Sequence, residues 1–180
     1  TETIHKEYDC FFKLDVKEIM WSKGNMGERK RMIETVEPGE TIIDMFAGIG
    51  YFSIPIAVHS KVKKIYSIEK NPVSFNYLKE NIKLNKITNI DPIFGDCTKV
   101  EIKEKADRVL MGLLPSAKEF LPKALEFVKH GGIIHYHGID GEIPKKLKKD
   151  VEDYGKIIKK VKIKSWAPRK YHWVLDVLAE

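Results

Sequence analysis

The chain has 180 residues, 43% of them hydrophobic, and a formal net charge of +6 at pH 7. That length can bury one sizeable core and leaves no room for a second large domain, so the composition is that of an ordinary globular protein. The two cysteines have no C-x-x-C spacing and no histidine at ligand spacing, which argues against a disulfide framework and a zinc site, and we predict no metal.

The N-terminal residues carry no targeting or membrane signal. Residues 1–9 are polar and charged, and no apolar run in the chain is long enough to span a bilayer. We therefore expect a cytoplasmic protein with no membrane partner. Because the chain begins with Thr1 rather than Met and starts in mid-pattern, we also expect an upstream segment that is missing here.

The most informative stretch is 41–50, which reads TIIDMFAGIG and predicts a buried strand ending in a glycine-built turn. Gly48 and Gly50 lack the Cβ that would keep the backbone away from a ligand. Residues 51–59 have the apolar content of a helix packed on a sheet. This is how an α/β sheet prepares a nucleotide site.

The next two elements strengthen that interpretation. Residues 63–69 predict a second strand, and its last residue, Glu69, follows Gly48 by 21 residues. That offset is typical of a carboxylate that accepts both ribose hydroxyls of a nucleotide. Residues 72–86 predict a helix that begins with a proline and has Asn71 as its cap.

The remaining elements alternate in the manner of a doubly wound sheet. We predict strands over 91–95, 106–111 and 133–139, helices over 118–129 and 143–154, and a closing hairpin of 157–166 and 171–178 around Pro168. The helix 118–129 is predicted to stop at Gly131 and Gly132. The fold class is therefore α/β, with a mostly parallel seven-stranded sheet and a C-terminal antiparallel hairpin.

Two classes of cofactor fit this geometry. A dinucleotide site such as that of a nicotinamide dehydrogenase needs a third glycine, where this chain has Ser53. Asp44 in the first turn would repel a pyrophosphate but attract a sulfonium group, so we favour S-adenosylmethionine. The alternative without a ligand is that the glycines only make a tight turn and Glu69 is a solvated strand end.

Ligands of such sheets bind outside the carboxyl ends of the strands. We therefore expect five features to converge at this edge: Asp44, Gly48, Glu69, Asp96 at the end of the third strand, and the turn 112–116. Asp96 is placed to accept a hydrogen bond from an adenine amino group, and the backbone of Cys97 to donate one to the ring. The alternative for Asp96 is a plain turn residue after a glycine.

The chain resembles the class I S-adenosylmethionine enzymes, within the group that contains the tRNA guanosine-37 methyltransferases and the archaeal wybutosine-pathway aminocarboxypropyl transferases. The resemblance covers almost the whole chain. It depends on Asp44–Gly50, on Glu69–Pro72 with the following Asn81 and Asn85, and on Met20–Asn25 with Glu28 and Arg29.

Two departures separate the branches of this group. The methyltransferase branch has an asparagine followed by Leu-Pro after the fourth strand, and Phe-Ser-Pro-Arg upstream. This chain has Gly112-Leu113-Leu114-Pro115 and Trp21-Ser22-Lys23-Gly24 at these places, which is similar to the aminocarboxypropyl branch. A sulfonium offers three carbons to a nucleophile, so the orientation of the donor decides the product.

The resemblance implies transfer of the 3-amino-3-carboxypropyl group to the 4-demethylwyosine base at position 37 of tRNA(Phe), with release of methylthioadenosine. Ser22 and Arg29 would contact the donor, and Arg29 would hold its carboxylate bidentately. Residues 1–30 would form a strand hairpin and a cofactor-contacting segment, and residues 31–180 the catalytic domain. We assign no catalytic base, although Glu28 matches an acidic position that serves the methyltransferase branch.

The expected partner is the tRNA anticodon loop, and no protein partner is predicted. Lysines at 145–149 and from 156 to 164 could follow a phosphate backbone, or form the solvated surface typical of proteins from very hot habitats. Two alternative functions stay open: methyl transfer to guanosine at the same tRNA position, and a catalytically silent module that only binds RNA.

Overall fold

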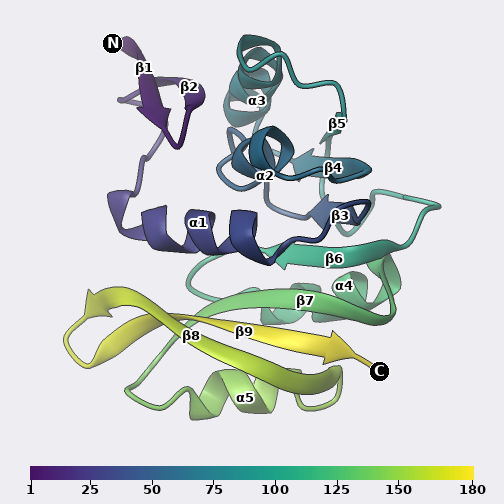
Figure 1. Ribbon diagram of the computed structural model, residues 1–180. Coiled ribbons are helices and arrows are strands. Elements are labelled where there is room, and N and C mark those ends of the chain that lie inside the picture. Colours follow the sequence, from purple (N-terminus) through teal and green to yellow (C-terminus); the bar gives the residue numbers. More distant parts are fainter. The chain divides into compact units, whose positions relative to one another are not determined.

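A computed structural model describes residues 1–180 (Figure 1). The chain divides into two compact units, residues 1–100 and 101–180. The boundary expected between residues 30 and 31 stays a prediction. No helix in the structure combines the length and the apolar character needed to cross a membrane.

The first unit begins with an antiparallel hairpin of β1 (Glu2–Glu7) and β2 (Cys10–Asp15). Tyr8 and Asp9 connect the strands with φ values of 48° and 56°, the left-handed conformation that a two-residue hairpin turn requires. The chain then forms the short 3-10 helix η1 (Lys23–Asn25) and the helix α1 (Met26–Thr35).

A parallel sheet forms the centre of the first unit, with the strand order β5–β4–β3. All four residues of β3 are buried, as expected of a parallel strand covered on both faces. The sheet consists of β3 (Thr41–Asp44), β4 (Lys64–Glu69) and β5 (Ile90–Phe94), and the helices that connect its strands are α2 (Ser53–His59) and α3 (Pro72–Leu84).

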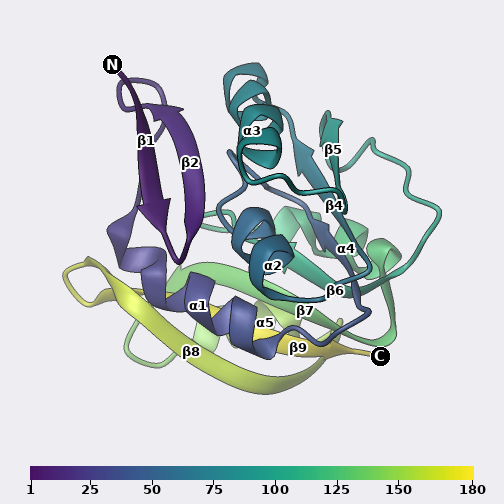
Figure 2. The same cartoon turned by 45° about the horizontal axis from the view of Figure 1, so that its top comes forward.

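Helix α3 contacts the N-terminal hairpin through two asparagines, Asn81 within the helix and Asn85 at its C-cap. Figure 2 shows β2 beside α3. Asn81 accepts a hydrogen bond from Lys13 N (2.7 Å) and donates to Lys13 O (3.2 Å), and Asn85 accepts from Phe11 N (2.8 Å) and donates to Phe11 O (2.7 Å). Residues i and i+4 of a helix and residues i and i+2 of a strand repeat over similar distances, about 6 Å and 6.6 Å, so the two amides match the strand.

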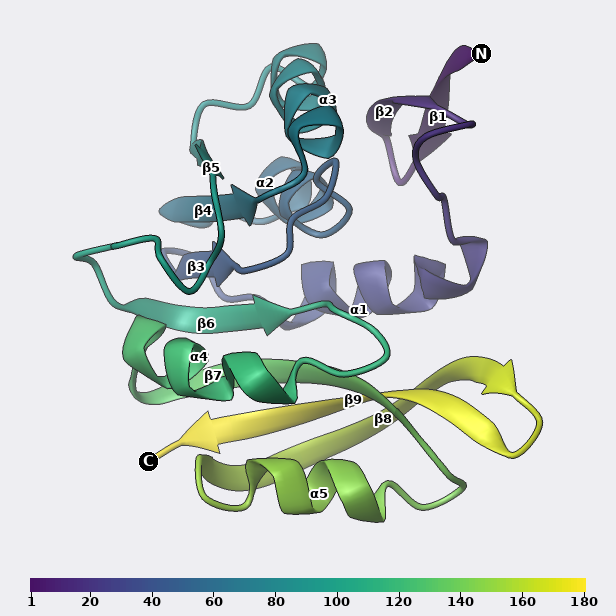
Figure 3. The ribbon, with the colours of Figure 1, turned by 180° about the vertical axis from the view of Figure 1, so that it is seen from behind.

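The second unit has the strand order β6–β7–β9–β8, in which β6 and β7 are parallel and the other pairs antiparallel. Seen from behind in Figure 3, α4 covers β6 and β7. The strands are β6 (Ala106–Met111), β7 (Val128–Asp140), β8 (Gly155–Ala167) and β9 (Lys170–Ala179), and the helices are η2 (Lys118–Phe120), α4 (Leu121–Phe127) and α5 (Lys145–Val151).

The predicted fold class is confirmed: parallel strands with connecting helices are followed by an antiparallel C-terminal hairpin, and the two units together contain seven strands besides β1 and β2. The predicted end of the helix 118–129 was wrong. The helix stops at Phe127, and β7 begins at Val128 and runs through Gly131 and Gly132, where its register with β6 shifts. The glycines therefore lie within an irregular strand start, not at a helix cap.

Candidate functional site

The turn between β3 and α2 requires glycine at two positions. Gly48 has a φ of 58° and Gly50 a φ of 99°, conformations that side-chain-bearing residues rarely adopt. A Cβ on Gly50 would also stand 2.5 Å from Ile54 Cγ1, and one on Gly48 2.6 Å from the ring of Tyr51. The turn therefore keeps its backbone bare, as the sequence predicted.

Glu69, at the end of β4, reaches back to this turn. Its Oε2 accepts a hydrogen bond from Gly48 N (2.7 Å) and its Oε1 accepts one from Asn71 N (2.7 Å). A carboxylate has about four acceptor positions, so two remain on this half-buried side chain. Glu69 is thus fixed in one orientation and keeps the capacity to accept two ribose hydroxyls.

Asp96 follows β5, the strand next to β4, and Gly95 N donates to Glu69 O (3.0 Å). Its Oδ1 accepts from both the backbone N (2.9 Å) and the hydroxyl (2.7 Å) of Thr98, and these hydrogen bonds lower the pKa of Asp96. These hydrogen bonds are typical of a turn residue, which was the alternative interpretation of Asp96. They leave Oδ2 of Asp96 able to accept from another donor. Cys97 is buried beside it.

The carboxyl ends of β3, β4 and β5 therefore bring together Gly48, Glu69 and Asp96, as expected of an edge that binds a nucleotide. The predicted turn 112–116 belongs to the second unit. Its Leu114–Pro115 peptide bond is cis.

Asp44 differs from the expectation of a charge that faces the ligand. Its side chain is only 1% exposed, accepts hydrogen bonds from Ser53 Oγ (2.8 Å) and Phe46 N (3.3 Å), and Ser67 Oγ donates to Ser53 Oγ (2.7 Å). Burial raises the pKa of Asp44 to about 7. The observed role of this carboxyl is to connect β3, α2 and β4, and its contact with a ligand stays a prediction.

Ser53, interpreted from the sequence only as the missing third glycine, is the centre of that connection. Its hydroxyl donates to Asp44 and accepts from Ser67, and the side chain is fully buried. A serine three residues after the second glycine was the available signal, but a buried carboxyl partner cannot be recognised from that spacing.

Arg29 also differs from its predicted role. The carboxylate that it holds bidentately belongs to Glu7, with Nε–Oε1 at 2.6 Å and Nη2–Oε2 at 2.9 Å, and the arginine is 1% exposed. Its Nη2 also donates to Ser22 O (3.2 Å), and its guanidinium lies 4.8 Å from the centre of the Trp21 ring. Arg29 therefore holds the backbone of the Trp21–Ser22 segment in place.

That segment lies against the glycine turn within the first unit. The hydroxyl of Tyr51 donates to Met20 O (2.6 Å), and the rings of Trp21 and Tyr51 are 5.5 Å apart. Ser22 stands at the N-cap of η1, but its side chain makes no cap hydrogen bond. Tyr51, which the sequence interpretation gave no role, is the link between the two segments.

Glu28, to which we assigned no role, is buried, and its two oxygens accept hydrogen bonds from Arg31 Nη2 and Nε at 2.7 Å each. In residues 1–180 no three His, Cys, Asp or Glu side chains are grouped so that they could hold a metal ion.

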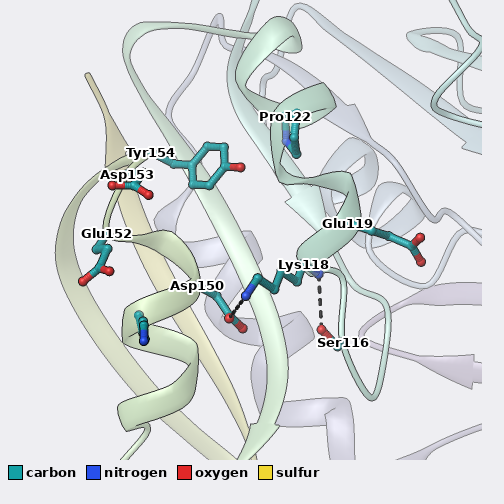
Figure 4. A pocket seen from close by; sticks show the side chains of 9 residues that line it. Ser116, Lys118, Glu119, Pro122, Asp150, Glu152, Asp153 and Tyr154 are labelled. Atoms are coloured by element: carbon teal, nitrogen blue, oxygen red, sulfur yellow. Dashed lines mark hydrogen bonds and ion pairs between the residues drawn. The ribbon is translucent and has the colours of Figure 1, made fainter.

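The second unit has a separate hollow of about 660 Å³ (Figure 4). Lys118 reaches across it to the buried Asp150 (3.1 Å), which also accepts a hydrogen bond from Tyr136 (3.1 Å). Ser116 accepts a hydrogen bond from Lys118 N (3.2 Å). These polar groups are hydrogen-bonded or ion-paired to one another. Their contacts connect α5, β7 and the segment before α4.

Three histidines noted in the sequence are buried in the second unit. His135 Nδ1 pairs with Asp176 (2.7 Å), and His137 Nδ1 lies 2.9 Å from His172 Nε2. Burial lowers the pKa of His172 to about 4, which keeps it neutral near pH 7. All three belong to the interior of the sheet.

Comparison with known protein families gives one match, the TRM5/TYW2 methyltransferase domain, over residues 3–164. A tRNA(Phe) (4-demethylwyosine(37)-C(7)) aminocarboxypropyltransferase of Methanocaldococcus jannaschii is 52% identical, over 100% of this chain and 76% of the relative. The Pyrococcus horikoshii protein of that name is 43% identical, over 98% and 67%. A tRNA (guanine(37)-N(1))-methyltransferase Trm5b of Pyrococcus abyssi is 39% identical, over 98% of this chain but only 55% of the relative.

Solved structures give the same result. M. jannaschii TYW2 in complex with AdoMet superposes with a TM-score of 0.90 at 51% identity, over 98% of this chain and 85% of that one. P. horikoshii TYW2 in complex with MeSAdo superposes with a TM-score of 0.91 at 41% identity, over 99% and 71%.

Proposed function

Because the chain belongs to the TRM5/TYW2 methyltransferase domain family, we propose that it transfers the 3-amino-3-carboxypropyl group of S-adenosylmethionine to C7 of 4-demethylwyosine at position 37 of tRNA(Phe). The observation that carries this function is the 52% identity, over the whole chain, to a relative named for that reaction. The Gly112 and Trp21–Gly24 departures from the methyltransferase pattern support the same branch.

The residues of the first unit fit the donor. Glu69 has two acceptor positions left for the ribose hydroxyls, and the bare backbone at Gly48 and Gly50 permits close approach. We propose that Asp96 accepts from the adenine amino group and that Cys97 N donates to the ring. Ser22 would contact the methionine arm, with Arg29 behind it as a positioning residue.

The chemistry that the donor supplies is a sulfonium, from which a carbon nucleophile takes one of three substituents. Attack by C7 at the Cγ of the methionine arm forms a C–C bond, breaks the Cγ–S bond and leaves its electron pair on sulfur, and the ring then loses the C7 proton. The neutral product is methylthioadenosine. The protein decides this outcome by orientation, because only the carbon held in line reacts at a useful rate.

The RNA partner is a tRNA, and we propose that the anticodon loop enters the site, because position 37 lies in that loop. We propose the cytoplasm as its location, since tRNA is modified there. Methyl transfer to guanosine at the same position is the second candidate, favoured by the 39% identity to Trm5b.

The experiment that tests the function is product analysis. The protein is incubated with S-adenosylmethionine and tRNA(Phe) that carries 4-demethylwyosine, and the small-molecule products are identified by mass spectrometry. We expect methylthioadenosine, and none when the tRNA carries unmodified guanosine at position 37. S-adenosylhomocysteine from either tRNA would assign the methyltransferase branch instead, and binding of both substrates with no product would support a silent module.

A further inference from the structure

The positive charge of the chain is concentrated in one segment. Residues 155–170, which we call the β8 strip, contain seven basic residues and no acidic one. The other 164 residues contain 25 basic and 26 acidic residues. Their formal net charge is therefore −1, whereas that of the β8 strip is +7. The net positive charge of the chain therefore comes from β8, the turn that follows it and the first residue of β9.

The β8 strip does not have the pattern of a thermophilic surface, which forms ion-pair networks of both signs. Several lysines elsewhere are paired, such as Lys13 with Glu2 and Glu80, and within the strip Lys162 pairs with Glu142. Lys156, Lys159 and Lys160 are exposed and form no ion pair. A segment with seven basic residues and no acidic one is typical of a surface that meets an anionic partner.

A groove continues this surface toward α5. It has a volume of about 440 Å³ and is lined by Lys145, Lys148, Lys149, Glu152, Gly155 and Ile157. Three lysines and one glutamate give it a positive lining at the point where β8 starts. In Figure 3, α5 runs alongside β8, so the helix lysines lie next to the β8 strip.

The other end of the β8 strip carries an aromatic side chain. Trp166 is 50% exposed near the β8–β9 turn, has no ring partner, and is followed by Arg169 and Lys170. A flat exposed ring next to a line of cations is how proteins bind single-stranded nucleic acid: the cations follow phosphates and the ring stacks on a base.

We propose that the β8 strip is the RNA-docking surface of the second unit, where Lys156, Lys159 and Lys160 contact phosphates of the tRNA and Trp166 stacks on an unpaired base. This inference rests on the proposed function for the presence of a tRNA substrate. The competing explanation is that lysines on an outermost strand only prevent pairing with other chains.

The test compares two triple variants that remove the same charge. The first is K156Q/K159Q/K160Q, and the control is K61Q/K79Q/K83Q, whose lysines are exposed in the first unit. Binding of the full chain to a fluorescent RNA hairpin with the anticodon stem-loop sequence of tRNA(Phe) is measured across a KCl series. We expect the strip variant to bind at least about tenfold more weakly, because each lost phosphate contact lowers the salt slope by about 0.7 to 0.9.

The control should bind within about twofold of the unmodified chain and keep its salt slope. W166A should bind at least about fivefold more weakly with an unchanged slope, because stacking is not ionic. An unchanged affinity and slope in the strip variant, together with new self-association in ultracentrifugation, would overturn the proposal in favour of edge protection. Equal losses in both triple variants would also overturn it, as would equal competition by phosphatidylserine vesicles.

Failure of the proposed reaction can be distinguished from failure of the proposed RNA-docking surface. Binding of S-adenosylmethionine, measured by calorimetry, should be the same in all these variants, and the release of methylthioadenosine from modified tRNA is judged on the unmodified chain. A chain that binds the hairpin through the β8 strip yet releases no methylthioadenosine would refute the reaction and leave the RNA surface standing. One that releases it but loses nothing in the strip variant would refute only the surface.

Discussion

At the scale of single residues, the site depends on Glu69, which both holds the Gly48 turn and offers acceptors to a ligand. Its two oxygens are committed to two backbone N–H groups, so its geometry exists before any donor arrives. Preorganisation of this kind lowers the ordering cost of binding.

Glu69→Gln should weaken S-adenosylmethionine binding about 10- to 100-fold, since one charged acceptor is replaced by an amide that can accept at only one atom. Isothermal titration calorimetry measures the affinity. Glu101→Gln, at an exposed position of the chain, is the matched control and should leave it unchanged. An affinity of Glu69→Gln within a factor of two of the unmodified chain would remove Glu69 from the binding site.

The raised pKa of Asp44 predicts how stability varies with pH. The folded protein binds the proton up to about pH 7, whereas the unfolded chain releases it near 3.8, so this group costs stability progressively as pH rises through that window. The asparagine of Asp44→Asn does not titrate. The free energy of unfolding of this variant should therefore rise relative to that of the unmodified chain between pH 4 and 7, by at most about 4 kcal/mol. Urea unfolding at several pH values checks this. A pH-independent difference would mean that Asp44 is ionised in the folded state.

At the scale of elements, prediction succeeded where a local pattern determines the structure. The glycines after β3 and the cap of α3, where Asn71 accepts from Val73 N and Ser74 N, are fixed by neighbours in the sequence. The spacing from Gly48 to Glu69 likewise predicted that the two residues meet at one edge of the sheet, because parallel neighbouring strands end at the same edge, but it did not predict the hydrogen bond between them.

Helix α1 was not among the predicted elements for a physical reason. Its buried side chains are Glu28, Arg29 and Met32, so charged residues occupy positions where a hydrophobic period would be sought. The partner of Arg29 is Glu7, 22 residues earlier, and nothing in the sequence distinguishes that acid from the 25 others. The bidentate partner of Arg29 in the structure is thus Glu7, whereas its predicted contact with the donor carboxylate stays a prediction.

The contact between α3 and β2 can be tested at Asn81, which is fully buried and hydrogen-bonds Lys13 N, Lys13 O and Ile49 O. Asn81→Ala leaves these backbone groups unsatisfied and should lower the free energy of unfolding by about 2–4 kcal/mol. Chemical denaturation measures it. Asn76→Ala, at an exposed position of the same helix, should change it by less than about 0.5 kcal/mol. Equal effects at both positions would show that the amide contacts add nothing to stability.

At the scale of the whole molecule, the charge is divided between a nearly neutral majority and the β8 strip. The sequence interpretation could not separate the lysines of 145–149 from those of β8. The structure separates them by element: the first group lies on α5, which ends beside Glu152 and Asp153, and the second lies on β8, where Lys162 pairs with Glu142 but Lys156, Lys159 and Lys160 form no ion pair.

This division predicts that the strip is not a source of stability. K156Q/K159Q/K160Q should keep its melting temperature within about 2 °C of the unmodified chain, because the three lysines are exposed and no ion pair is lost. Differential scanning calorimetry at low ionic strength shows the effect most clearly. A fall of 5 °C or more would mean that these lysines support the fold and would complicate their use as binding variants.

The amides of Asn81 and Asn85 have one more consequence, for association between chains. A two-stranded hairpin exposes the outer N–H and C=O groups of each strand to any passing strand, and such edges initiate aggregation. On β2 those groups, at Phe11 and Lys13, are already occupied by side chains of α3 that imitate a third strand. A helix thus seals one edge of the hairpin, and the N-terminal strands can remain short without offering β2 as a template to another copy.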